Sequence, residues 1–178
     1  MMVHSTKLEP VAGWTYLGDP SIDSDKVTTG VAPIRNVRFL LDLGGGIFML
    51  LGFLHALYTF LDIAKPRRLV PQDSAVTIAM TKSAVRLSRG GTTMWRAWVG
   101  FNFSHSLGAI LFGALCIATG AILAAMVISA WILLSLVVIA LIYLVLSVLY
   151  WFRIPTAGIA LAAGCLFMAW FMYAVHRV

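Results

Sequence analysis

One stretch of the chain, from Trp98 to Phe152, contains no Asp, Glu, Lys or Arg. A helix needs about 20 apolar residues to cross the hydrocarbon core of a bilayer, so this stretch is about twice as long as one crossing. It must therefore turn back and cross twice. A soluble fold is excluded as well, because 61% of the residues are apolar and only 11% are charged, too few charges to cover a surface in water.

Four apolar segments are each long enough to cross the bilayer once. The long uncharged stretch divides near residues 119–126, where Gly120 and other small residues interrupt the bulky ones. We therefore predict an all-α fold, a four-transmembrane-helix bundle formed by a single membrane domain of residues 38–178. Its crossings are expected at residues 39–61, 97–119, 127–151 and 157–175.

Two polar segments lie outside these crossings. Residues 1–37 are rich in Pro, Gly, Asp, Ser and Thr and lack sustained periodicity, which predicts an extended extramembrane tail. Residues 62–96 connect the first two crossings. Within this connection, residues 73–89 intersperse apolar residues with basic ones, which predicts a short amphipathic helix at the membrane surface.

The basic residues predict the orientation. The connection 62–96 carries seven Lys and Arg residues and the short turn after the third crossing adds Arg153, whereas the turn near residues 120–126 carries none. By the positive-inside rule the connection should be cytoplasmic, and four crossings then place both termini outside. We expect lipid headgroups, not nucleic acid, to bind the basic residues that follow the first crossing: Lys65, Arg67 and Arg68.

Polar side chains form a stripe within the apolar crossings. His55, Tyr58, Thr59 and Asp62 recur at helical spacing on one face of the first crossing, and Asn102 and His105 share a face of the second. Both histidines should lie about 10–12 Å below the same interface, where they can meet. A polar residue inside a crossing is a functional hypothesis by default.

Three roles for this polar cluster stay open. His55 and Asn102, or His105 and a hydroxyl, can form a hydrogen-bonded clasp that sets helix register, which is the reading we favour. Two imidazoles can instead bind a haem iron, or one can bind the magnesium of a chlorophyll. Arg96 and Asn102 can also lie on a proton or substrate path, which would require a cavity. We expect no resident cofactor, no metal site and no catalytic residue, because the sequence contains no nucleophile with its base.

Small residues recur along the crossings. Gly44, Gly45 and Gly46 lie within the first, and other glycines follow in the second and fourth. In lipid, helices associate where small residues let the backbones approach closely. We expect internal packing of the bundle, and the alternative is that these three glycines receive a helix or a ring from a partner.

One motif resembles a known family. The stretch from Thr92 to Gly108, TTMWRAWVGFNFSHSLG, is similar to a signature of small bacterial membrane proteins of uncharacterised function, first catalogued in Leptospira-type genomes. Segments around His55 and from Tyr150 to Pro155 resemble the same family. The resemblance covers about residues 40–175 and implies the four-crossing layout in a bacterial inner membrane, with interest at Trp95, Arg96, Asn102 and His105. It implies no activity, and the tail departs from the family pattern.

The tail favours an accessory role. A polar segment of this length can hardly bury itself on a bundle embedded in lipid, so we expect it to dock on other subunits through Trp14 and Tyr16. The sequence therefore predicts a non-catalytic subunit of a respiratory or photosynthetic membrane complex. The alternatives are a haem- or chlorophyll-binding membrane protein that uses His55 and His105, and a small membrane enzyme or transporter.

Overall fold

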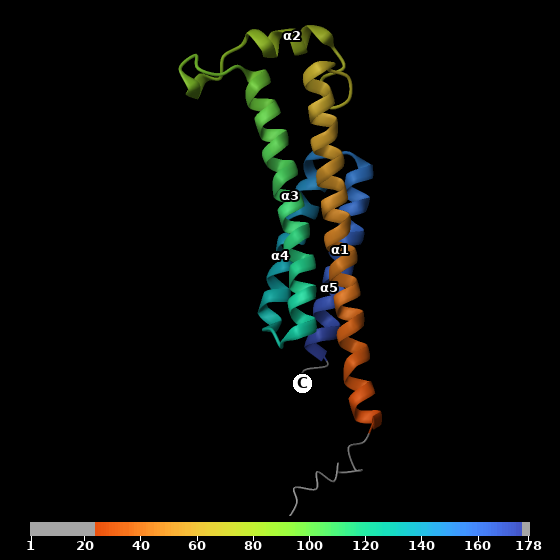
Figure 1. The fold of residues 1–178 in the computed structure, drawn as a ribbon. Helices are drawn as coiled ribbons and strands as arrows, with labels where there is room; N and C mark the ends of the chain where they lie inside the picture. Colours follow the sequence, from red (N-terminus) through yellow and green to blue (C-terminus); the bar gives the residue numbers. More distant parts are fainter. Residues whose placement is uncertain (1–23, 176–178) are drawn as a thin grey trace, which may run out of the picture.

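The computed structural model describes residues 24–175, and the side chains from residue 34 onward (Figure 1). Trp14 and Tyr16 lie outside this range. Within it, the chain forms helices and short connections, with no strand. The helices are α1 (Ser24–Ala64), α2 (Ser74–Lys82), the 3-10 turn η1 (Arg86–Ser88), α3 (Met94–Ala125), α4 (Ala130–Tyr150) and α5 (Arg153–Val175).

Four of these helices are long and apolar enough to cross a membrane: α1 from Ile34 onward, α3, α4 and α5. Their outer faces carry large exposed apolar side chains along their length, such as Phe53, Phe101 and Leu146. This distribution is what lipid as a solvent permits and water does not. The protein is therefore a multi-pass membrane protein, and the predicted all-α fold with four crossings is confirmed.

Helix α1 is the centre of the bundle. It packs along α3 on one side and α5 on the other, while α4 packs along α5. The α1–α3 contact is made backbone to backbone, because a Cβ atom added at Gly45 would lie 2.6 Å from the carbonyl oxygen of Gly113. Small residues at such a contact strengthen helix association in lipid through close packing.

The two longest helices project beyond the other two. In Figure 1, the upper ends of α1 and α3 extend past the upper ends of α4 and α5, and α2 lies across their tips. From His55 to Ala64, α1 continues for about 13 Å at 1.5 Å per residue. The junction of α4 and α5 therefore lies below the upper ends of α1 and α3.

Helix α1 begins earlier than predicted. Residues 24–37 were expected to belong to the extended tail, but they form the start of this helix. The side chain of Val37 is 1% exposed and lies in the same core cluster as Leu41. Tertiary packing thus extends the helix into a segment whose composition alone predicts an irregular one.

Helix α3 also continues further than predicted. The turn expected near residues 119–126 lies at Met126–Ser129, because Gly120 packs against Asp42 and Arg38 of α1 instead of interrupting the helix. The hydroxyl of Tyr173 in α5 donates to the carbonyl of Ile128 and accepts from its N–H group, which holds this turn against the bundle. The fourth crossing was expected from residue 157, but α5 starts at Arg153 and includes Pro155. A proline is tolerated there because the first turn of a helix does not use its N–H groups.

The interfacial helix is shorter than predicted. Helix α2 ends at Lys82, and residues 83–94 fold back as a loop closed by hydrogen bonds between Val85 and Thr92 and between Ser83 and Met94. The Ser88 hydroxyl bonds to both backbone groups of Thr92. Such local bonds from a serine side chain compete with the helix. Arg89 and Gly90 make the reversal with positive φ angles of 47° and 88°.

Candidate functional site

A hydrogen bond joins α1 to α3 inside the bundle. The Nε2 atom of His55 lies 2.8 Å from Oδ1 of Asn102, and Nδ2 of Asn102 donates to the carbonyl of Trp98 one turn earlier. Because a carbonyl only accepts, the amide nitrogen must face Trp98 and the amide oxygen must face His55. Nε2 of His55 therefore carries the hydrogen and donates it. This is the clasp that the sequence predicted between His55 and Asn102.

His105 lies beside this pair without a hydrogen bond of its own to any residue in the described range. Its ring contacts that of His55 edge to face, with the centroids 5.5 Å apart, and that of Trp151 at 4.4 Å. The Trp151 ring is also parallel to the His55 ring, at 6.3 Å. The structure thus brings the two predicted histidines together. It adds the aromatic wall of Trp151, from the junction of α4 and α5.

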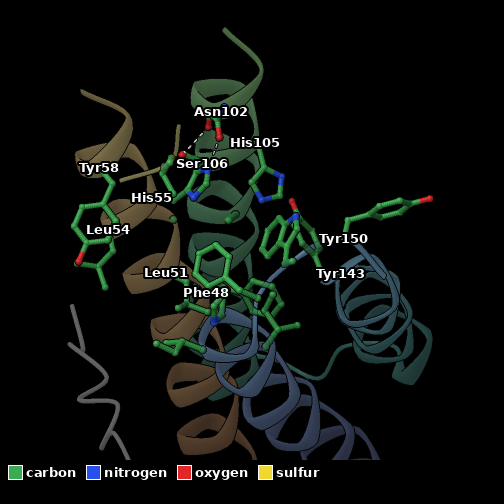
Figure 2. A pocket seen from close by; sticks show the side chains of 18 of the residues that line it. Phe48, Leu51, Leu54, His55, Tyr58, Asn102, His105, Ser106, Tyr143 and Tyr150 are labelled. Atoms are coloured by element: carbon green, nitrogen blue, oxygen red, sulfur yellow. Dashed lines mark hydrogen bonds between the residues drawn. The ribbon is translucent and has the colours of Figure 1, made fainter. Parts of the chain in front are cut away.

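These rings line a cavity of about 540 Å³. Figure 2 shows its side chains converging from α1 and α3 on one side and from α4 and the α4–α5 junction on the other. His55, Asn102, His105 and Ser106 line the cavity at the level of the clasp, and Phe48 and Tyr143 line a second, aromatic level. The rim is open, since Leu54, Tyr58 and Tyr150 are all exposed. A cavity of this size, mostly apolar with a few polar groups, is typical of small-molecule sites.

An aromatic cluster closes the deep end of the cavity. The ring of Phe48 contacts Phe112 edge to face at 4.7 Å, and Tyr143 of α4 packs on both rings. Phe48 is 1% exposed. Edge-to-face aromatic pairs add to the stability that burial alone provides, so packed aromatic rings close this end of the cavity.

The outer end is lined by the connection after α1. Asp62 is completely buried, and its carboxylate accepts backbone N–H groups from three successive residues of that connection, Arg67, Arg68 and Leu69. This holds the chain in a tight turn. The guanidinium carbon of Arg68 then lies 5.7 Å from the centroid of the Tyr58 ring, a cation–π contact at the cavity rim.

The remaining predicted residues have different positions. The hydroxyl of Thr59 is buried and donates to the carbonyl of His55, so it supports α1 and does not line the cavity. Arg96 is exposed in the first turn of α3 and does not line the cavity either. A proton or substrate path was predicted to involve both Arg96 and Asn102. Of these two residues, Asn102 lines the cavity and Arg96 does not.

The three neighbouring glycines of α1 face different surroundings. A Cβ atom at Gly44 would meet Leu166 of α5 at 3.1 Å, and Gly45 faces α3. At Gly46 an added Cβ would meet nothing within 4 Å. Gly44 and Gly45 are therefore occupied by packing inside the bundle and are not available to a partner. Of the three glycines, Gly46 alone has room for a helix or a ring from a partner.

The geometry restricts which cofactor the histidines can bind. The two imidazoles are in direct contact and His55 already donates from Nε2, so no layer is left between them for the macrocycle of a haem with two histidine ligands. His105 alone is free to bind a single metal centre of a ring cofactor. Among the described residues, no three His, Cys, Asp or Glu side chains gather as a metal site.

Three contributors to this site lie outside the stripe that the sequence indicated. Tyr143 lies within α4 and Trp151 directly follows it, and Arg68 reaches the cavity through the turn around Asp62. A signal was present on α1, where Phe48, Leu51, His55 and Tyr58 share one face at helical spacing. No sequence pattern shows that α4 ends at the level of His55.

No family model, curated protein or solved structure matches the chain. The resemblance to the Leptospira-type membrane proteins therefore stays a prediction.

Proposed function

We propose that the protein binds an amphiphilic small molecule in the cavity between α1, α3 and the α4–α5 junction. One observation carries the proposal: an open-rimmed cavity of about 540 Å³ contains the imidazole of His105, which has no hydrogen-bond partner in the described part of the chain. The imidazole is accessible from the cavity, so water or the polar group of a ligand can complete its hydrogen bonds there. The protein is proposed to bind and not to catalyse.

The lining explains why the ligand should have two unlike ends. Phe48, Ala109 and Ile159 are buried at the apolar end, whereas His105, Tyr58 and Arg68 offer hydrogen-bond donors toward the rim. A ligand with an apolar body and a polar head matches this division. Membrane-dissolved amphiphiles can enter through the exposed rim without crossing water.

The test is to recover the ligand. The full chain is purified in a mild detergent, extracted with organic solvent, and analysed by mass spectrometry and by its visible spectrum. We expect about one bound amphiphile per chain in the wild type and about a ten-fold loss in His105→Ala. Ser104→Ala is the matched control, because Ser104 is the neighbouring residue, is exposed, and bonds only to the carbonyl of Phe101. Equal retention in both variants, or none in the wild type, would contradict the proposal.

The same spectrum addresses the cofactor alternative. A haem or chlorophyll bound through His105 would absorb visible light, and His105→Ala would abolish that absorbance. A colourless ligand would limit the proposal to amphiphiles without a metal centre.

A role as accessory subunit of a respiratory or photosynthetic complex is the second candidate. Its main argument, the tail with Trp14 and Tyr16, lies outside the described residues, but the open Gly46 on α1 favours a neighbouring helix. Stoichiometric co-purification with the subunits of one large complex, lost in Gly46→Ile, would support it. Recovery of the chain alone would contradict it.

The proposed location is a bacterial inner membrane, with connection 62–96 cytoplasmic and both termini periplasmic. Leu87 in this connection is 94% exposed and Val127 in the α3–α4 turn is 77% exposed, so each is suited to labelling as a cysteine. The native Cys116 and Cys165 are buried. In intact spheroplasts, an impermeant maleimide should label Val127→Cys and spare Leu87→Cys, and the reverse pattern would invert the orientation.

A further inference from the structure

The charges around the cavity are unbalanced. Arg68 is the single charged residue among those that line it, and no carboxylate does. In the described range the ion pair formed by a carboxylate and a basic side chain is that of Arg38 and Asp42, at the other end of α1. The Arg68 guanidinium therefore lies at the rim of an apolar cavity without a carboxylate within ion-pair distance.

The position of Arg68 is determined by its backbone. The buried Asp62 carboxylate accepts the N–H groups of Arg67, Arg68 and Leu69, at 2.6 to 3.1 Å, which fixes the turn from which the side chain extends. The Tyr58 ring then supports the guanidinium at 5.7 Å. Arg67, one residue earlier on the same turn, does not line the cavity. A cation held by a turn and a ring in this way is pre-organised for a ligand.

The polar groups between Arg68 and the aromatic end add donors. The His105 imidazole has at least one N–H group without a partner in the described range, and the Tyr58 side chain is exposed at the rim. His55 and Asn102 satisfy each other. The cavity thus offers positive charge and hydrogen-bond donors at one end and no negative charge to balance them.

We infer that the cavity selects an amphiphile with an acidic head group, a carboxylate or a phosphate monoanion, which Arg68 binds at the rim while its hydrocarbon part lies against Trp151 and Phe48. This inference rests on the proposed function and adds the class of ligand. An anion accepts charge-assisted hydrogen bonds from a guanidinium, which are about twice as strong as those of a neutral acceptor. A cationic head group would face Arg68 without a counter-charge.

The test uses the tryptophans of the cavity. Trp98 and Trp151 line it, so in a chain whose four other tryptophans are replaced by phenylalanine, a bromine atom on a bound acyl chain quenches the fluorescence of these two. The full chain is reconstituted in phosphatidylcholine vesicles and titrated with a dibrominated fatty acid at a pH that ionises it, and with its uncharged methyl ester. Brominated phosphatidylglycerol and brominated phosphatidylcholine form a second acidic and neutral pair, so that a carboxylate source and a phosphate source are told apart.

We expect half-maximal quenching at about ten-fold lower mole fraction for at least one acidic probe than for its neutral counterpart. Arg68→Gln should remove this preference and Arg68→Lys should keep most of it. Arg67→Gln is the matched control, because it removes the same charge from the adjacent residue outside the cavity, and it should keep the preference.

Three results would overturn the inference. If Arg67→Gln and Arg68→Gln lose the preference for acidic probes equally, that preference comes from general surface charge and not from the cavity. In the second case, acidic and neutral probes quench equally and saturably, and the quenching is lost in His105→Ala. That result would support the proposed ligand site but contradict a preference for an acidic head group. If neither kind of probe shows saturable quenching, the proposed function fails as well.

Discussion

The Nε2 atom of His55 donates to Oδ1 of Asn102 at 2.8 Å, while the Asn102 amide donates to the carbonyl of Trp98. This clasp satisfies two polar side chains inside the apolar bundle and sets the register of α1 against α3. It also leaves His105, one turn beyond Asn102, free for another partner. The contrast between a satisfied and an unsatisfied imidazole is the basis of the functional proposal.

The clasp should contribute measurably to stability. We expect His55→Ala and Asn102→Ala to be coupled by about 0.6 kcal/mol in a double-mutant cycle, the average for hydrogen bonds between membrane helices. The free energies of unfolding are measured in detergent micelles. The pair His55→Ala and Ser104→Ala is the control and should be additive, because Ser104 bonds within its own helix. A coupling of zero for His55 and Asn102 would mean that the bond is not formed.

Backbone contact between α1 and α3 should make Gly45 intolerant of any side chain. Gly45→Ala places a Cβ atom 2.6 Å from the Gly113 carbonyl oxygen, so the helices must separate, and we expect a loss of about 1–3 kcal/mol. Gly46→Ala meets nothing within 4 Å and should unfold at the wild-type temperature. Thermal unfolding of the two purified variants checks this, and equal behaviour of the two would contradict the helix contact.

The buried Asp62 should control the connection after α1. Asp62→Ala leaves the N–H groups of Arg67, Arg68 and Leu69 without their acceptor, so we expect the turn to open and trypsin to cleave after Arg67 or Arg68 more than about ten-fold faster. Asp73→Ala is the control, since Asp73 caps the exposed α2 through Ala75. Its cleavage at these two arginines should match the wild type. Unchanged cleavage in Asp62→Ala would show that the carboxylate does not hold the turn.

The turn between α3 and α4 should depend on one hydroxyl. Tyr173→Phe removes the group that bonds to both the N–H and the carbonyl of Ile128, and we expect a loss of about 1–2 kcal/mol. Tyr150→Phe removes a hydroxyl from a side chain that is 77% exposed and should change the free energy of unfolding little. If Tyr173→Phe is as stable as Tyr150→Phe, these bonds do not stabilise the turn.

Part of the candidate site followed from sequence spacing. His55 and Asn102 were expected to meet because both lie at the same depth on polar faces of neighbouring crossings, and the hydrogen bond between them agrees. The ends of the helices were less predictable. The turn after α3 lies at Met126–Ser129 because Gly120 is packed against α1, and residues 24–37 join α1 because Val37 is buried. Each depends on a neighbour that is distant in sequence.

The sequence by itself determined that this chain crosses a membrane four times as helices, because a bilayer accepts long uncharged segments only with their backbone bonds satisfied internally. The tertiary structure alone decided where the cavity lies. It lies where α4 and α5 meet at the level of His55 while α1 and α3 continue beyond them, and Asp62 fixes the turn from which Arg68 joins its lining. The level at which each helix ends beside its neighbours, and the path of a connection, depend on packing between distant segments. Local sequence patterns do not encode that packing.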